Sequence, residues 1–189
     1  MELELKRHEW RSLQGVSGDA GALESALRAL AQAGDRDEAV QAARRVERVI
    51  FAQGLLCEAS AAAASTLVHC LWRRSEHAED LILGMLSDIS VAVVDEEDPT
   101  VYGPISQEQC LSEIRLGFPM YVEILEAGKS IHSRTACIDL ILACGLSDER
   151  LRGRSVYFLG KALQLDGLEG HRDVIHASIR ELSEGGAAR

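Results

Sequence analysis

Aromatic residues are scarce in this sequence: they make up 4% of its 189 residues, and there are only three prolines. The strands of β-sandwiches and barrels favour aromatic and β-branched side chains, so this scarcity argues against an all-β fold. Hydrophobic residues nevertheless make up 47% of the chain, and most of them are Ala or Leu, the strongest apolar helix formers. Length and composition together predict packed helices around a sizeable core.

Basic residues are also few, with 20 Lys and Arg against 30 Asp and Glu, so the net charge is −10. A phosphate backbone is bound by Lys and Arg that displace counterions, and this balance therefore argues against a nucleic-acid partner. There is no uncharged run of about 18 apolar residues that could span a membrane. The N-terminus has no apolar stretch of signal-peptide length. We therefore expect a soluble, cytoplasmic protein with no membrane association.

Patterns typical of metal, nucleophile or phosphate sites are missing too. The cysteines are odd in number and none forms a C-x-x-C pair, so we expect small buried apolar residues in a reducing compartment. They are Cys57, Cys70, Cys110, Cys137 and Cys144. The six histidines form neither H-E-x-x-H nor H-x-x-x-H, and the glycines form no phosphate loop. The sequence thus predicts no catalytic residue, no metal and no cofactor.

Helix signals, by contrast, recur along the chain with short breaks between them. Leu23, Ala26, Leu27 and Leu30 have the i, i+3, i+4, i+7 spacing of a buried helix face. Asp35 with Glu38 matches a capping box and begins the next helix. A later apolar stripe runs from Ala78 to Val93, and Pro119 predicts a break in a helix spanning about 107–127. Taken in consecutive pairs, these helices would form four hairpins, near 21–51, 57–93, 107–144 and 147–183.

The hairpins repeat with a period close to 40 residues and two helices per unit, the size of a HEAT or armadillo repeat. Such hairpins cannot bury their apolar face alone and stack into a curved array. We therefore predict an all-α fold, a short right-handed α-solenoid of about four pairs; a globular helix bundle is the alternative. Residues 1–189 would form one domain, with an N-terminal extension (1–19), an acidic inter-helix loop (94–105) and a frayed tail (185–189).

Particular stretches resemble bacterial HEAT-like repeat proteins. Gln53-Gly-Leu-Leu-Cys-Glu-Ala-Ser60 is similar to their Gly-x-x-x-Glu-Ala helix entry, and Leu81-Ile-Leu-Gly-Met-Leu-Ser-Asp-Ile89 is similar to the Leu-x-x-Leu-Leu-x-x-Ile helix that follows. Arg134 and Ala136 stand as the Arg and Ala that precede buried aliphatic residues in another such entry, although Lys129 and Ser130 replace the usual acid. Several proteins of this shape are similar to immunity proteins, the antidotes encoded beside interbacterial toxins. The resemblance implies a binding role against a partner protein.

The negative net charge is concentrated in about one third of the chain, because residues 51–110 hold ten acidic residues and only two basic ones, which accounts for −8 of the −10. The densest point is the run Asp95-Glu96-Glu97-Asp98, followed by Tyr102 in the longest break between helices. Long loops often carry binding residues, acids attract a basic surface, and a tyrosine ring can anchor a contact. The candidate partner-binding residues are Glu58, Asp80, Asp95, Glu96, Glu97, Asp98 and Tyr102. A solvated loop is the plainer interpretation, and a calcium site is disfavoured because the ligand alternation and central glycine are missing.

These observations lead to a functional expectation of protein binding without catalysis. We expect an immunity protein whose acidic surface covers the basic active-site surface of a cognate toxin that acts in the cytoplasm. A regulatory adaptor that bridges cellular proteins is the alternative. A helical-repeat base-excision glycosylase is disfavoured, since it needs a basic groove with aromatic residues.

Overall fold

The computed structural model describes residues 1–51, 54–72, 76–94 and 102–184 of the chain, and most of these residues are helical. The helices are α1 (Glu2–Arg7), α2 (Ala22–Gln32), α3 (Arg36–Ile50), α4 (Ala59–Leu71), α5 (Glu79–Val91), α6 (Gln107–Arg115), α7 (Phe118–Ala127), α8 (Ile131–Ser147), α9 (Glu149–Ala162) and α10 (Arg172–Glu184). Two short 3-10 turns, η1 (Trp10–Ser12) and η2 (Glu169–His171), and one two-stranded hairpin accompany them. The predicted all-α class, built from helical hairpins, is confirmed.

Two compact units make up the chain, Met1–Ile114 and Arg115–Arg189. Each has its own set of packed helices and its own buried core. The expected single domain over 1–189 stays a prediction, and the frayed tail expected at 185–189 lies outside the described residues.

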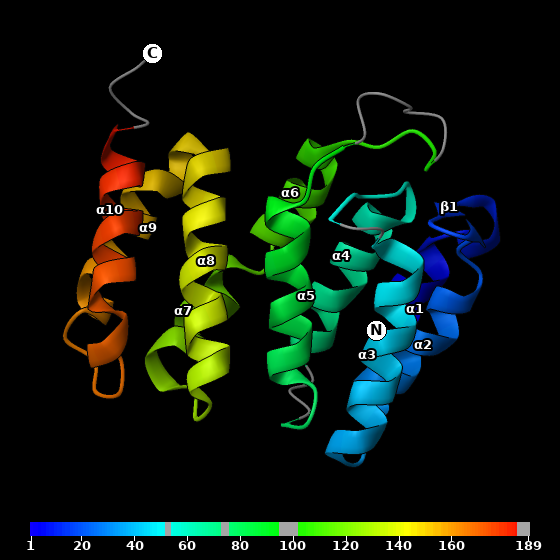
Figure 1. Cartoon of the computed structure of the whole chain (residues 1–189), viewed down its shortest axis with the longest axis horizontal. Helices are drawn as coiled ribbons and strands as arrows, with labels where there is room; N and C mark the ends of the chain where they lie inside the picture. The colour runs from blue at the N-terminus through cyan, green and yellow to red at the C-terminus, as the bar shows by residue number, and fades with distance from the viewer. Residues whose placement is uncertain (52–53, 73–75, 95–101, 185–189) are drawn as a thin grey trace. The chain divides into compact units, whose positions relative to one another are not determined.

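Helical hairpins form the body of the first unit, where α2 packs on α3 and α4 packs on α5 (Figure 1). The predicted face of α2 is buried, with Leu23, Leu27 and Leu30 fully out of solvent. The predicted cap of α3 is also present: an Asp35 carboxylate oxygen accepts a 2.9 Å hydrogen bond from the Glu38 amide. Such a cap satisfies one of the amide groups that the first turn of a helix leaves unpaired.

At the centre of this unit, α4 is buried on almost every side. Eleven of its 13 residues are buried, and its first half consists of alanine and serine. These small side chains leave room for neighbours to approach closely, and α4 packs against α1, α2, α3 and α5 as well as strand β1 (Gln14–Gly15).

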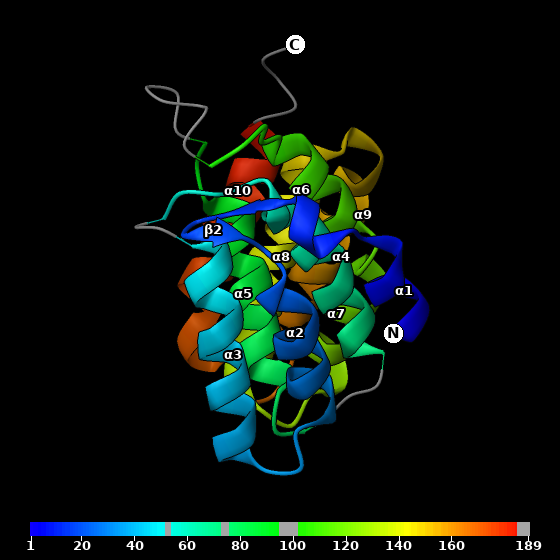
Figure 2. The same ribbon diagram turned by 90° about the vertical axis from the view of Figure 1, so that its right-hand side faces the viewer.

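The N-terminal extension 1–19 is ordered and folds onto the same unit (Figure 2). It forms α1, η1 and a hairpin in which β1 pairs antiparallel with β2 (Gly18–Asp19). Leu5 and Trp10 are buried, and the Trp10 indole N–H donates a 2.8 Å hydrogen bond to the Leu5 carbonyl. Apolar periodicity does not predict how this segment folds. Its anchors are two large buried side chains, Leu5 and Trp10, and not a repeated apolar stripe.

In the second unit, each of α7, α8 and α9 packs against the next helix along the chain. The break predicted by Pro119 is confirmed: α6 ends at Arg115, and Pro119 lies in the first turn of α7, where its missing N–H is not needed. The start expected for the last hairpin was one residue early, since α8 extends to Ser147 and the Asp148 side chain caps α9.

No helix within the described ranges is both long and apolar enough to cross a bilayer.

Candidate functional site

Two of the predicted binding residues, Glu58 and Tyr102, lie together in the first unit. The Glu58 amide donates a 2.8 Å hydrogen bond to the Tyr102 carbonyl, and Tyr102 is half-buried. The Glu58 carboxylate is already engaged, because one of its oxygens accepts a 2.8 Å hydrogen bond from the Gln14 amide. Glu58 therefore joins β1 to the beginning of α4. Its carboxylate stabilises the fold whether or not it also contacts a partner.

Asp80 lies elsewhere. It is the second residue of α5, about 16.5 Å along the helix axis from Val91, the end of the helix nearer to Glu58. Its carboxylate forms a two-point ion pair with the Arg36 guanidinium, one bond being 2.7 Å from Nη2 to Oδ2. The structure thus separates Asp80 from Glu58 and Tyr102, and it gives Asp80 a partner that the sequence did not suggest.

The acidic run Asp95, Glu96, Glu97 and Asp98 lies outside the described residues. The chain on either side of the run is held near the beginning of α4. Val93 donates a 3.2 Å hydrogen bond to the Gly54 carbonyl, and Tyr102 accepts the bond from Glu58.

Exposed apolar groups lie next to this point, at the C-terminal end of α5. Val91 is 71% exposed and Val93 is 56% exposed. Val93 was expected on the buried stripe of α5, and that expectation was wrong. The helix ends at Val91, and Val93 instead forms a backbone bridge with Leu55, which turns its side chain to solvent.

A shallow pocket of about 400 Å³ has Val91 in its lining, together with Glu47, Phe51 and Asp88, and Val93 follows Ala92 of that lining along the chain. Loss of hydration raises the pKa of Asp88, and this carboxylate forms no ion pair with another residue in the described ranges. We call Glu47, Phe51, Asp88, Val91 and Val93 the α5-end surface. It combines an apolar centre with acidic neighbours, a combination that suits a partner with basic and apolar groups.

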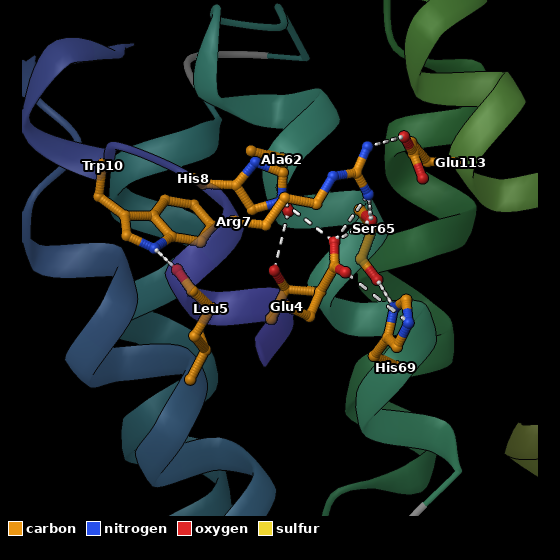
Figure 3. A network of polar contacts seen from close by, with 10 residues as sticks. Glu4, Leu5, Arg7, His8, Trp10, Ala62, Ser65, His69 and Glu113 are labelled. Carbon is orange, nitrogen blue, oxygen red and sulfur yellow. Dashed lines mark hydrogen bonds and ion pairs between the residues drawn. The ribbon is translucent and has the colours of Figure 1, made fainter. Parts of the chain in front are cut away.

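A second polar site, which sequence reasoning missed, joins α1 to α4 around the carboxylate of Glu4 (Figure 3). The same carboxylate oxygen accepts hydrogen bonds from the Ser65 hydroxyl at 2.6 Å, from Arg7 at 3.1 Å and from the His8 Nε2 at 3.1 Å. The other oxygen lies 3.8 Å from the His69 Nε2. The i, i+4 spacings of Glu4 with His8 and of Ser65 with His69 were the only signals in the sequence.

The protonation of Glu4 follows from these contacts. Burial raises its pKa, but the hydrogen bonds from Ser65 and His8 and the nearby charges of His69 and Arg7 outweigh burial, and the pKa lies below its ordinary value. The carboxylate is therefore ionised at neutral pH. Because Ser65 donates its proton to this carboxylate, the arrangement holds α1 on α4 and does not activate the hydroxyl as a nucleophile.

All five cysteines are buried, as predicted, and none of the five forms a disulfide bond. Burial raises the pKa of the Cys110 thiol and of the Cys144 thiol to about 12. No group of three or more His, Cys, Asp or Glu within the described part of the chain is arranged to hold a metal ion.

Comparison of the chain with protein-family models, curated proteins and solved structures gives no match.

Proposed function

We propose that this chain is a non-catalytic protein-binding module, an immunity protein that covers the basic active-site surface of a cognate toxin. The observation that carries the proposal is the α5-end surface, where exposed Val91 and Val93 adjoin carboxylates and the flanks of the acidic run. Apolar groups at the centre of an interface supply most of the affinity, and acidic groups around it accelerate encounter with a basic partner.

The charge of this region favours a basic partner. Residues 51–110 carry ten acidic and two basic residues, and Asp88 has no cation paired with it in the described part of the chain. A basic partner would supply that counter-charge. A toxin active site that holds an anionic substrate with Lys or Arg would present such a surface.

The alternative is a regulatory adaptor that bridges two cellular proteins. Its support is the division into two compact units, each with large exposed apolar side chains of its own, such as Val91 in the first and Tyr157 in the second. An adaptor predicts several partners, none of them toxic.

The first experiment is a pull-down from the native cells with this chain as bait, followed by expression of each retained protein with and without the chain. We expect one tight partner that stops growth alone and is harmless in the presence of the bait. Several partners without effect on growth would contradict the immunity function and favour the adaptor.

The same partner then tests the surface. Two variants address it: Asp95→Asn, Glu96→Gln, Glu97→Gln, Asp98→Asn with Tyr102→Ala, and Val91→Ser with Val93→Ser. Each should weaken binding at least about tenfold, or about 1.4 kcal/mol. A control that neutralises four exposed acids elsewhere, at Asp37, Asp173, Glu181 and Glu184, should bind as the wild type does. Unchanged affinity in the first two variants would remove this surface from the proposal.

A further inference from the structure

The second unit has a groove between α7 and α9 that no step of the proposed function uses. Its volume is about 430 Å³, and its lining is mostly apolar, with Val122 and Leu125 from α7 and Phe158 and Leu165 from α9 and the turn after it. A groove between two helices with this lining has the character of sites that accept the apolar face of a third helix.

Tyr157 stands at this groove with 59% of its surface exposed. Its ring packs edge-on against Phe158, with 5.4 Å between centroids, and the Lys161 ammonium lies 5.7 Å from the centre of the Tyr157 ring. A large side chain held in place by its neighbours loses little conformational freedom on binding, and tyrosines of this kind are common anchors at interfaces.

Positive charges lie on either side of the aromatic pair. Arg154, Tyr157, Phe158 and Lys161 follow the i, i+3, i+4, i+7 spacing and so share one face of α9. The Arg154 guanidinium lies 5.1 Å from the centre of the Phe118 ring. Neither Arg154 nor Lys161 forms an ion pair with another residue in the described ranges.

The two cations are seven residues apart, which places them about 10.5 Å apart along the helix axis. Lys161 and Glu126 are the one cation and the one carboxylate in the lining, and Arg154 adds a second cation on the same face of α9, outside the lining. In a chain with a net charge of −10, this face of α9 is therefore locally positive.

We propose that this groove, which we call the α9 groove, binds an amphipathic helical segment of a partner protein that carries two acidic residues about two turns apart. The apolar face of that segment would pack on Tyr157 and Phe158, and its carboxylates would contact Arg154 and Lys161. Seven-residue spacing on the partner helix reproduces the separation of the two cations, which fixes the register of the bound segment. The proposal does not depend on what the α5-end surface binds.

A labelled synthetic peptide tests the proposal with the full chain. The probe is a helical peptide of about four turns with Leu at i, i+3, i+4 and i+7 and two Glu residues seven positions apart beside that stripe. A second peptide has Lys in place of both Glu residues. Fluorescence anisotropy at low and at physiological salt should show saturable binding of the Glu peptide only, weaker at the higher salt.

Variants of the chain then locate the binding. Arg154→Gln with Lys161→Gln, and separately Tyr157→Ala, should each weaken binding at least about tenfold. The control Arg172→Gln with Arg180→Gln removes two exposed arginines from α10 and should leave the affinity unchanged. Thermal unfolding of every variant checks the fold, and amide shifts on titration of the wild type should cluster on α7 and α9.

Three results would overturn the proposal. One is the absence of saturable binding, another is equal binding of the Lys and Glu peptides, and the third is wild-type affinity in the Arg154/Lys161 variant. A labelled oligothymidine that binds more tightly than the Glu peptide and is lost with Tyr157→Ala would assign the groove to single-stranded nucleic acid instead.

Discussion

The amide of Glu58 and the carbonyl of Tyr102 are joined by a 2.8 Å hydrogen bond that returns the chain to the beginning of α4. Gly103 follows directly, with a φ of +80°, a conformation in which a side chain is strained. A Cβ at this position would lie 2.9 Å from the Glu58 Cβ and 3.0 Å from the Gln14 Cβ. The return of the chain therefore depends on a residue without a side chain.

We expect Gly103→Ala to lower the free energy of unfolding by about 1–2 kcal/mol, because the left-handed backbone and the contact with Glu58 both oppose a Cβ. The matched control is Gly84→Ala inside α5, where the new Cβ would meet nothing within 4 Å apart from its chain neighbours and the backbone of its own helix, and which should raise stability by about 0.5–1 kcal/mol. Urea denaturation measures both. A Gly103→Ala variant as stable as the wild type would contradict the close approach described here.

The Glu4 site makes stability depend on pH in a defined direction. The folded pKa of Glu4 lies below its ordinary value of 4.5, so its contribution is complete above that value and is lost as the pH falls through the folded pKa. Glu4→Gln should therefore cost about 1–3 kcal/mol at pH 7, and the difference from the wild type should shrink in acid. Urea denaturation at several pH values provides the test.

Glu9→Gln is the control for this prediction, because Glu9 is exposed on the same N-terminal segment. It should leave stability unchanged at every pH. A Glu4→Gln deficit that stays constant down to pH 3 would show that the loss comes from packing and not from the carboxylate charge.

The buried thiols should be protected from chemical modification. Because burial raises the pKa of Cys110 and Cys144 to about 12, little thiolate forms at pH 8 in the native protein. We expect an aromatic disulfide reagent to modify the five cysteines only after unfolding, at a rate that rises with added urea. Rapid reaction of one equivalent under native conditions would indicate a cysteine more accessible than the structure shows.

Most of the fold follows from the sequence because its helices have strong periodic faces and clear stop signals. Leu23, Leu27 and Leu30 lie where the stripe predicted, Asp35 caps its helix, and Pro119 marks the break between α6 and α7. The ordered fold of residues 1–19 was not predicted, because it depends on contacts of Leu5 and Trp10 with distant parts of the chain.

The candidate site was only partly predictable for the same reason. Spacing along a chain cannot reveal that Arg36 neutralises Asp80, or that the Glu58 carboxylate accepts a bond from Gln14. Nor can helical periodicity show where a helix stops, which is why Val93 was expected inside and lies exposed. The acidic run can be read directly from the sequence. The exposure of Val91 and Val93 cannot, because it depends on where α5 ends.

The burial of α4 has a consequence for how this chain can change over generations. Four helices and a strand pack against this helix, and most of its small side chains are buried, so a mutation that enlarges one of them displaces neighbouring elements. The outer faces of α3 and α9 have no such constraint, since many of their side chains end in solvent. Natural variation should therefore concentrate on those outer faces, and a new binding specificity can arise there without loss of the scaffold.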